Sequence, residues 1–105
     1  MNRVVITGMA ALTPIGNDWA TVAQNLKTQT TGIQTMNDWE KYEGLNTRLA
    51  APVDFTRPKH YTRKQVRGMG RVAMLATYVS ELALQDAGLL NDPILRSGKM
   101  GVAYG

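Results

Sequence analysis

Hydrophobic residues at the start of the chain follow the pattern of a buried strand. Residues 4–7 read Val-Val-Ile-Thr, a β-branched run that passes into Gly8 without alternating polar positions. Unbroken apolar character of this kind is typical of a strand covered on both faces, as in a parallel sheet. A second run, at residues 99–105, predicts another strand at the opposite end of the chain.

A first helix is predicted from Asn17 or Asp18, either of which can cap it, to about Lys27. Its apolar residues recur at the spacing of one helical face. The stretch that follows has little periodicity. There we expect only a short helical turn over residues 36–42 and a short strand over residues 49–53.

The clearest predicted element is a helix over residues 63–87. Thr62 and Gln65 have the spacing of a capping box at its start, and Gly88 can take the left-handed conformation that ends it. Apolar residues surround its second half, which we therefore expect to be buried on most sides. Small residues form a stripe that permits close approach of a strand or another helix, at positions 73, 76, 80, 83 and 87.

The order of these elements, strand–helix–long helix–strand, defines an α/β class. Two strands do not make a stable isolated parallel sheet. We therefore expect residues 1–105 to be the amino-terminal part of a larger domain, with no internal boundary. A small autonomous α/β domain is the alternative.

Composition narrows the chemistry that this chain can perform. It contains no Cys, which excludes a disulfide framework, a thiolate zinc site and a cysteine nucleophile within these residues. No apolar run is long enough for a membrane span, and the N-terminal run is too short for a signal peptide. We expect a cytoplasmic protein that does not bind membranes.

Charge is distributed unevenly along the chain. Residues 57–105 hold eight basic and three acidic residues, and no acid interrupts residues 57–71. On the predicted helix Arg63, Arg67 and Arg71 lie one turn apart, with Lys64 beside them. Cations at a helix start oppose the macrodipole, so this arrangement favours an anion bound there by side chains and free backbone N–H groups. The alternative is a solvated basic face.

Other candidate chemistry is weak. Gly8 follows a predicted strand, but Ala10 and Thr13 occupy the next positions at which a dinucleotide-binding loop needs glycine. His60 is the only histidine and has no partner at catalytic or metal spacing, so we interpret it as part of the basic cluster or as a surface residue. No nucleophile–base pair is present. We expect no metal, no cofactor and no catalytic residue in this chain.

The nature of the anion can be narrowed from the surroundings of the basic residues. A nucleic-acid surface normally adds aromatic residues for stacking, and here only Tyr61 is near. The apolar helix that follows is not suited to a nucleic-acid groove. A small acidic protein or a phosphorylated ligand is therefore favoured over nucleic acid.

Several motifs in order resemble the β-ketoacyl-acyl-carrier-protein synthases of the synthase I/II type. The resemblance covers essentially the whole chain and is carried by residues 3–17, 19–26, 31–33, 63–69, 83–89 and 101–105. It implies a thiolase-like fold of layered α/β/α halves, of which this chain supplies the first strand, its crossover and the second strand. It also implies a cytoplasmic, homodimeric acyltransferase that condenses an acyl group with malonyl on acyl carrier protein in fatty acid or polyketide synthesis.

The same resemblance assigns a role to part of the basic region. Family members dock the acidic carrier protein with basic residues at the positions of Arg63, Lys64 and Arg67. The family's catalytic Cys, its two His and its Lys have no counterpart in this chain, which is predicted to be inactive alone.

Two positions depart from the family pattern. Ala10 stands where the family usually has Gly, and Gly70 where an Asp commonly follows the Met. A divergent member is therefore an open alternative, including a non-catalytic partner subunit. The other open alternative is a basic module that binds anions or nucleic acid.

Overall fold

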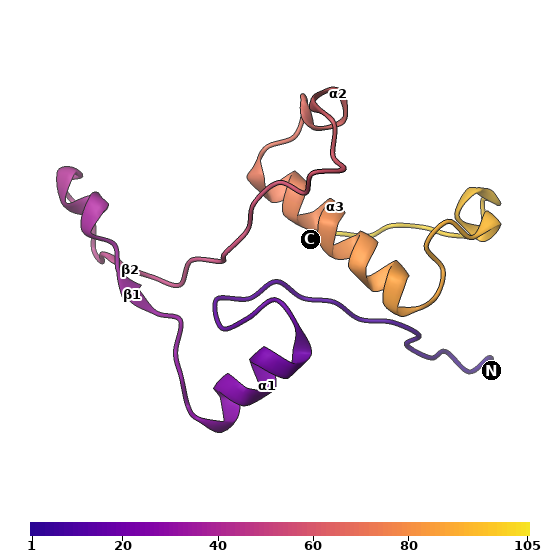
Figure 1. Ribbon diagram of the computed structural model, residues 1–105, viewed down its shortest axis with the longest axis horizontal. Helices are drawn as coiled ribbons and strands as arrows, with labels where there is room; N and C mark the ends of the chain where they lie inside the picture. The colour runs from indigo at the N-terminus through magenta and orange to yellow at the C-terminus, as the bar shows by residue number, and fades with distance from the viewer. The chain divides into compact units, whose positions relative to one another are not determined.

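In the computed structural model, which describes residues 1–105, the longest element is helix α3, Arg71–Asp86 (Figure 1). Helix α3 ends as predicted, with Gly88 just after it. Gly88 has a positive φ of 71°, and its N–H donates to Gln85 O at 3.1 Å. The Leu89 N–H reaches back to Leu84 O at 2.8 Å. These two bonds form a Schellman motif, which satisfies carbonyl groups that the helix end leaves free.

The N-terminal segment lies against the small residues of α3. A Cβ on Gly8 would lie 2.6 Å from both Ala83 O and Ala87 N, so this contact requires glycine. The Met9 N–H donates to Asp86 Oδ2 at 2.9 Å. The predicted stripe of small side chains thus does permit close approach of the chain to α3.

The C-terminal segment also contacts α3. The Tyr104 hydroxyl lies 2.6 Å from Ser80 Oγ and 2.9 Å from Ala76 O. Residues 4–7 and 99–105, however, are not paired as strands, and the prediction of two strands is wrong for this structure. A strand needs a neighbour to satisfy its backbone groups, and no ladder forms along either segment.

The long predicted helix is interrupted. Helix α2 spans Arg63–Val66, and α3 begins only at Arg71. Gly68 and Gly70 lie in the break, and glycine disfavours a helix interior because it loses the most backbone entropy on folding. Gly70 is the N-cap of α3 and has no side chain with which to cap it.

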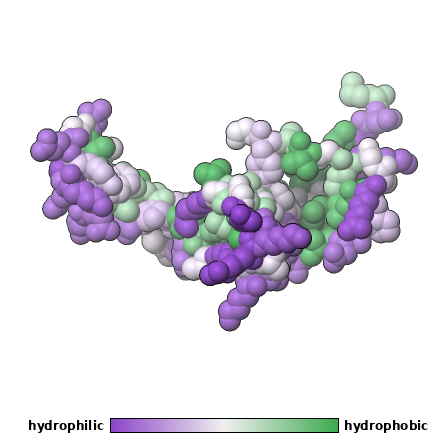
Figure 2. All heavy atoms as spheres, turned by 90° about the horizontal axis from the view of Figure 1, so that it is seen from above, coloured by the Kyte–Doolittle hydropathy of each residue, from purple (hydrophilic) through white to green (hydrophobic).

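Burial of α3 is less than expected. No side chain of the chain is fully buried, and the second half of α3 is half-buried at most of its positions. Figure 2 shows apolar side chains, in green, on the visible surface. The residues present do not cover α3 on its other sides, which is why the prediction of burial on most sides is wrong here.

Residues 11–58 form a separate unit. Its helix α1 spans Trp19–Lys27, and Asp18 caps it, with Oδ1 accepting from the Thr21 N–H at 2.8 Å. The cap follows the prediction, and its hydrogen bonds to Thr21 lower the pKa of the Asp18 carboxyl. The Asn25 side chain donates to Ile15 O at 2.6 Å and ties the helix to the preceding turn.

The same unit contains a short hairpin. Strand β1, Gln34–Thr35, pairs antiparallel with β2, Leu49–Ala50, and the 3-10 helix η1, Asn37–Lys41, lies between them. The predicted helical turn over 36–42 is confirmed, and the strand predicted over 49–53 is confirmed in its first two residues.

The other unit joins residues 1–10 to 59–105 and ends with the 3-10 helix η2, Pro93–Arg96, and the segment after it. The absence of an internal domain boundary, which the sequence predicts, stays a prediction.

Candidate functional site

The three residues expected to bind an anion lie close together in sequence: Arg63 and Lys64 on α2, and Arg67 at its C-cap. Arg63, Lys64 and Arg67 are all exposed, and with Val66 they line an open hollow of about 550 Å³. None of the three makes a hydrogen bond or ion pair with the rest of the chain. We call these three residues the basic patch. Their guanidinium and ammonium groups are therefore available to an external anion.

The N-terminus of α2 is closed by its own cap. Thr62 Oγ1 accepts from the Gln65 N–H at 3.3 Å, and Gln65 Oε1 accepts from the Thr62 N–H at 2.9 Å. This is the capping box predicted from the sequence. It changes the expected site, because one of the first N–H groups of the helix already has a partner. The basic patch is defined by its side chains and not by a helix end.

The predicted basic stripe is shorter than expected. Arg63 and Arg67 remain one turn apart, but Arg71 belongs to α3, after the break at Gly68 and Gly70. The regular spacing was derived for one continuous helix. It therefore does not place Arg71 with the basic patch.

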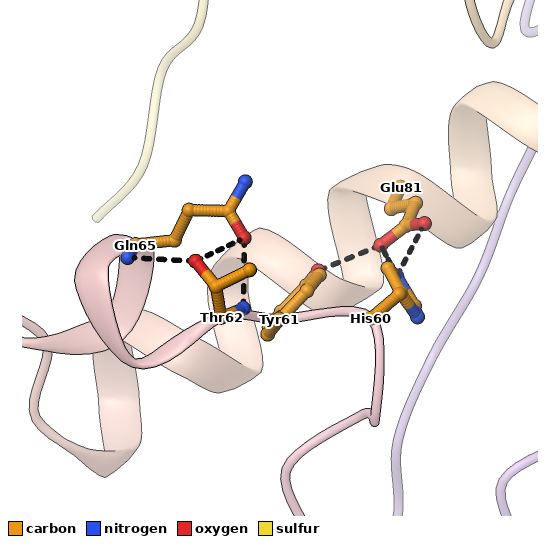
Figure 3. A network of polar contacts seen from close by, with 5 residues as sticks. All are labelled: His60, Tyr61, Thr62, Gln65 and Glu81. Carbon is orange, nitrogen blue, oxygen red and sulfur yellow. Dashed lines mark hydrogen bonds and ion pairs between the residues drawn. The ribbon is translucent and has the colours of Figure 1, made fainter.

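A polar cluster lies immediately before α2. Glu81 of α3 accepts a hydrogen bond from the Tyr61 hydroxyl at 2.7 Å, and His60 Nε2 lies 2.9 Å from Glu81 Oε1 (Figure 3). We call these three residues the Glu81 cluster. His60 is therefore paired with Glu81 rather than free in the basic patch, and with its side chain 58% exposed it is a surface residue, which is the second of the two interpretations given to it.

Titration in the Glu81 cluster follows from these contacts. The hydrogen bond from Tyr61 holds the pKa of the Glu81 carboxyl below its usual value, and His60 acts in the same direction. Burial, and then the hydrogen bond to Glu81, raises the pKa of Tyr61 to about 12. Both shifts favour a carboxylate that accepts from a protonated phenol.

Sequence reasoning missed Glu81, although a signal for it exists. Glu81 is the only acidic residue between Asp54 and Asp86, and it lies within an otherwise apolar stretch of α3. An isolated acid on an apolar helix needs a partner if it is to be partly buried. Its partners are 20 and 21 residues away in sequence, so no helical or strand periodicity identifies them.

Other classes of site are not formed by these residues. No group of three or more His, Asp or Glu side chains is arranged to hold a metal ion. None of the helices combines the length and apolar character needed to cross a bilayer.

Fold and surface together define a segment of helices and one short hairpin, with an exposed basic patch at a short helix. Residues 1–105 match the family described as "Beta-ketoacyl synthase, N-terminal domain". The chain therefore belongs to the β-ketoacyl synthase family.

Relatives with described names agree with this assignment. The chain is 39% identical over 94 residues to a 3-oxoacyl-(acyl-carrier-protein) synthase 2 of Staphylococcus aureus, covering 86% of this chain and 22% of that protein. It is 31% identical over 94 residues to synthase 1 of Haemophilus influenzae, covering 90% of this chain and 23% of that protein. The chain thus spans about a quarter of the length of these relatives.

A solved structure supports the fold. The crystal structure of a β-ketoacyl synthase from Burkholderia phymatum matches with a TM-score of 0.93 and 48% sequence identity, over 100% of this chain and 26% of that chain. The expected fold class, the N-terminal part of a thiolase-like α/β fold, is confirmed.

Proposed function

We propose that this chain is the N-terminal segment of a 3-oxoacyl-(acyl-carrier-protein) synthase. The complete enzyme would be a cytoplasmic homodimer that takes up an acyl group and condenses it with malonyl on the carrier protein, releasing carbon dioxide. Membership of the family and the names of the relatives support this proposal. The chain itself contains no Cys, so the acylated thiol and its catalytic partners belong to other parts of the enzyme.

Within that enzyme, the segment contributes scaffold and a docking surface for acyl carrier protein. The single observation that carries this role is the state of Arg63, Lys64 and Arg67, whose side chains are exposed and unpaired on one short helix and its C-cap. The nearest acids in sequence are Asp54 and Glu81, and Glu81 is bonded to other groups. An acidic protein surface would gain three charge-assisted contacts without breaking an existing ion pair.

Charge reversal in the intact synthase that contains this chain tests the docking role. We expect the triple variant R63E/K64E/R67E to weaken affinity for acyl carrier protein by about tenfold or more, and to flatten its dependence on salt. The matched control is Lys27→Glu, which reverses an exposed cation on α1. Unchanged affinity and salt dependence in the triple variant would refute the docking role.

The same variants distinguish a nucleic-acid surface. If the basic patch served nucleic acid, the triple variant would lose salt-dependent retention on heparin or DNA and keep its affinity for the carrier protein. The proposed function requires instead that the triple variant lose affinity for the carrier protein.

A further inference from the structure

We propose that Glu81 is a positioning residue for the basic patch. It holds the segment that begins α2 against α3, so that Arg63, Lys64 and Arg67 face the carrier protein in one defined orientation. The inference rests on the proposed docking function and goes beyond it, because it assigns the orientation of the patch to a side chain outside the patch.

Helix α2 cannot maintain its own position. It has only four residues, Arg63–Val66, and a single helical turn is unfavourable in water because nucleation fixes several dihedral angles for one hydrogen bond. Arg63 and the C-cap residue Arg67, which are four residues apart, carry like charges whose repulsion adds to the cost. Such a turn depends on its cap and on the chain to either side.

The connection that follows α2 gives little support. Gly68 and Gly70 lie between α2 and α3, and a Cβ at either position would meet no atom within 4 Å. Glycine also gives the backbone more freedom than any other residue. The side-chain hydrogen bonds that tie the start of α2 to α3 lie on its N-terminal side.

Three consecutive residues provide that fixation. The side chains of His60 and Tyr61 bond to Glu81 on α3, and the next residue, Thr62, caps α2 (Figure 3). The helix cap is thus separated by a single peptide bond from an anchored tyrosine. Anchoring Tyr61 to Glu81 closes a loop of the chain through α2 and back to α3, which restricts the positions that α2 can take.

The contacts of the Glu81 cluster suit an anchor. Tyr61 is half-buried, and its ring meets Tyr78 edge-on with centroids 6.4 Å apart. The Glu81 side chain is 27% exposed, against 58% for His60, so the bond from Tyr61 is the better shielded of the two. Hydrogen bonds to a carboxylate are stronger than those between neutral groups.

Kinetics of the intact synthase test this inference with two kinds of substrate. One is carried on acyl carrier protein, and the other is a short pantetheine thioester that lacks the carrier. We expect Glu81→Ala to raise KM for the carrier-borne substrate by about three- to tenfold, because the cationic side chains of α2 must then be ordered on docking. We expect kcat, and both constants for the short thioester, to stay unchanged.

Further variants separate positioning from general loss of structure. Glu81→Gln keeps an acceptor for Tyr61 and should restore most of the carrier KM. Tyr61→Phe should raise that KM, and combining it with Glu81→Ala should add little, because the two changes break the same contact. The matched control is Gln85→Ala, an exposed position one turn further along α3, which should leave every constant unchanged.

Each result decides one claim. If R63E/K64E/R67E raises the carrier KM and neither Glu81→Ala nor Tyr61→Phe does, the positioning role is wrong and the docking role stands. If neither set raises it, the docking role fails and the inference fails with it. An equal fall of kcat on both substrates would mark Glu81 as a general structural residue and overturn the inference. Should Glu81→Ala fail to fold, Tyr61→Phe gives the same decision, because it breaks the same contact from the other side.

Discussion

Helices α2 and α3 are consecutive in the chain and are held in opposite ways. Helix α3 is long and carries small residues against which the backbone at Gly8 packs without room for a Cβ. Helix α2 is one turn long, has no buried residue, and is held by a capping box and by the Glu81 cluster before it. The position of α3 depends on close packing, and that of α2 depends on hydrogen bonds.

This difference has a functional meaning for a family member. A helix fixed by close packing tolerates little added volume at its contacts. A helix fixed by a few polar contacts keeps its remaining surface free, and on α2 that surface carries the basic patch. The contrast predicts that substitutions which add volume will destabilise the contacts of α3, whereas substitutions which remove polar groups will destabilise α2.

The largest expected effect is at the contact between Gly8 and α3. Gly8→Ala places a methyl group 2.6 Å from Ala83 O and Ala87 N, both backbone atoms that cannot move without bending the helix. We expect the intact protein to lose about 3 kcal/mol of unfolding free energy, measured by thermal or denaturant unfolding. Gly101→Ala, where a Cβ meets no atom within 4 Å, is the matched control. Equal stability of the two variants would contradict the packing assigned to Gly8.

The next effect concerns the cap of α2. Thr62→Ala removes the oxygen that accepts from the Gln65 N–H, and loss of such a cap costs about 1 kcal/mol. We expect faster hydrogen exchange at the Gln65 amide, with little change in the global melting temperature. Thr62→Ser retains the hydroxyl and should retain the protection. A large fall in melting temperature would instead mean that α2 is part of the packed structure.

Local signals in the sequence predicted the ends of these helices well. The capping box at Thr62 and Gln65 and the stop at Gly88 each involve residues within one turn, so the residue types alone identify them. The break between α2 and α3 could also have been read from Gly68 and Gly70. The apolar periodicity on both sides obscured it.

Contacts between distant residues could not be predicted in the same way. The runs at 4–7 and 99–105 have the composition of strands, yet strand pairing depends on neighbours that the run itself does not specify. The Glu81 cluster joins α3 to residues about twenty positions earlier. Resemblance identified Arg63, Lys64 and Arg67 as docking residues, which stays a prediction, but it gave no indication of what orients them.

A smaller effect is the pH dependence of the Glu81 cluster. Because Tyr61 and His60 lower the pKa of Glu81 below its ordinary 4.5, the carboxylate stabilises the fold above that value. This contribution is lost as pH falls through the lowered pKa. The stability difference between the native protein and Glu81→Gln should therefore be present at neutral pH and vanish in acid.

At alkaline pH the stability contribution of the same cluster changes in the opposite direction, because it is lost as pH rises. The pKa of Tyr61 is raised to about 12, so its contribution is complete below the ordinary value of 10.0 and is lost as pH rises through about 12. Tyrosinate absorbance should show one late ionisation that is missing in Tyr61→Phe. Tyr42→Phe, at an exposed position, is the control and should leave that late step in place. Ionisation of Tyr61 together with the other tyrosines would contradict its bond to Glu81.

The smallest expected effect lies at the junction of the two helices. Gly70 is the N-cap of α3 with φ −76° and ψ 178°, makes no side-chain cap bond, and has open space where a Cβ would be. Aspartate fits that backbone, and its carboxylate would accept from a free N–H and interact favourably with the helix dipole. Gly70→Asp should stabilise the protein by a few tenths of a kcal/mol, measured by denaturant unfolding. Gly68→Asp, in the same break but not at the N-cap, is the control and should give no such gain. Equal gains at both positions would show that the effect comes from the reduced backbone freedom of the unfolded chain and not from capping.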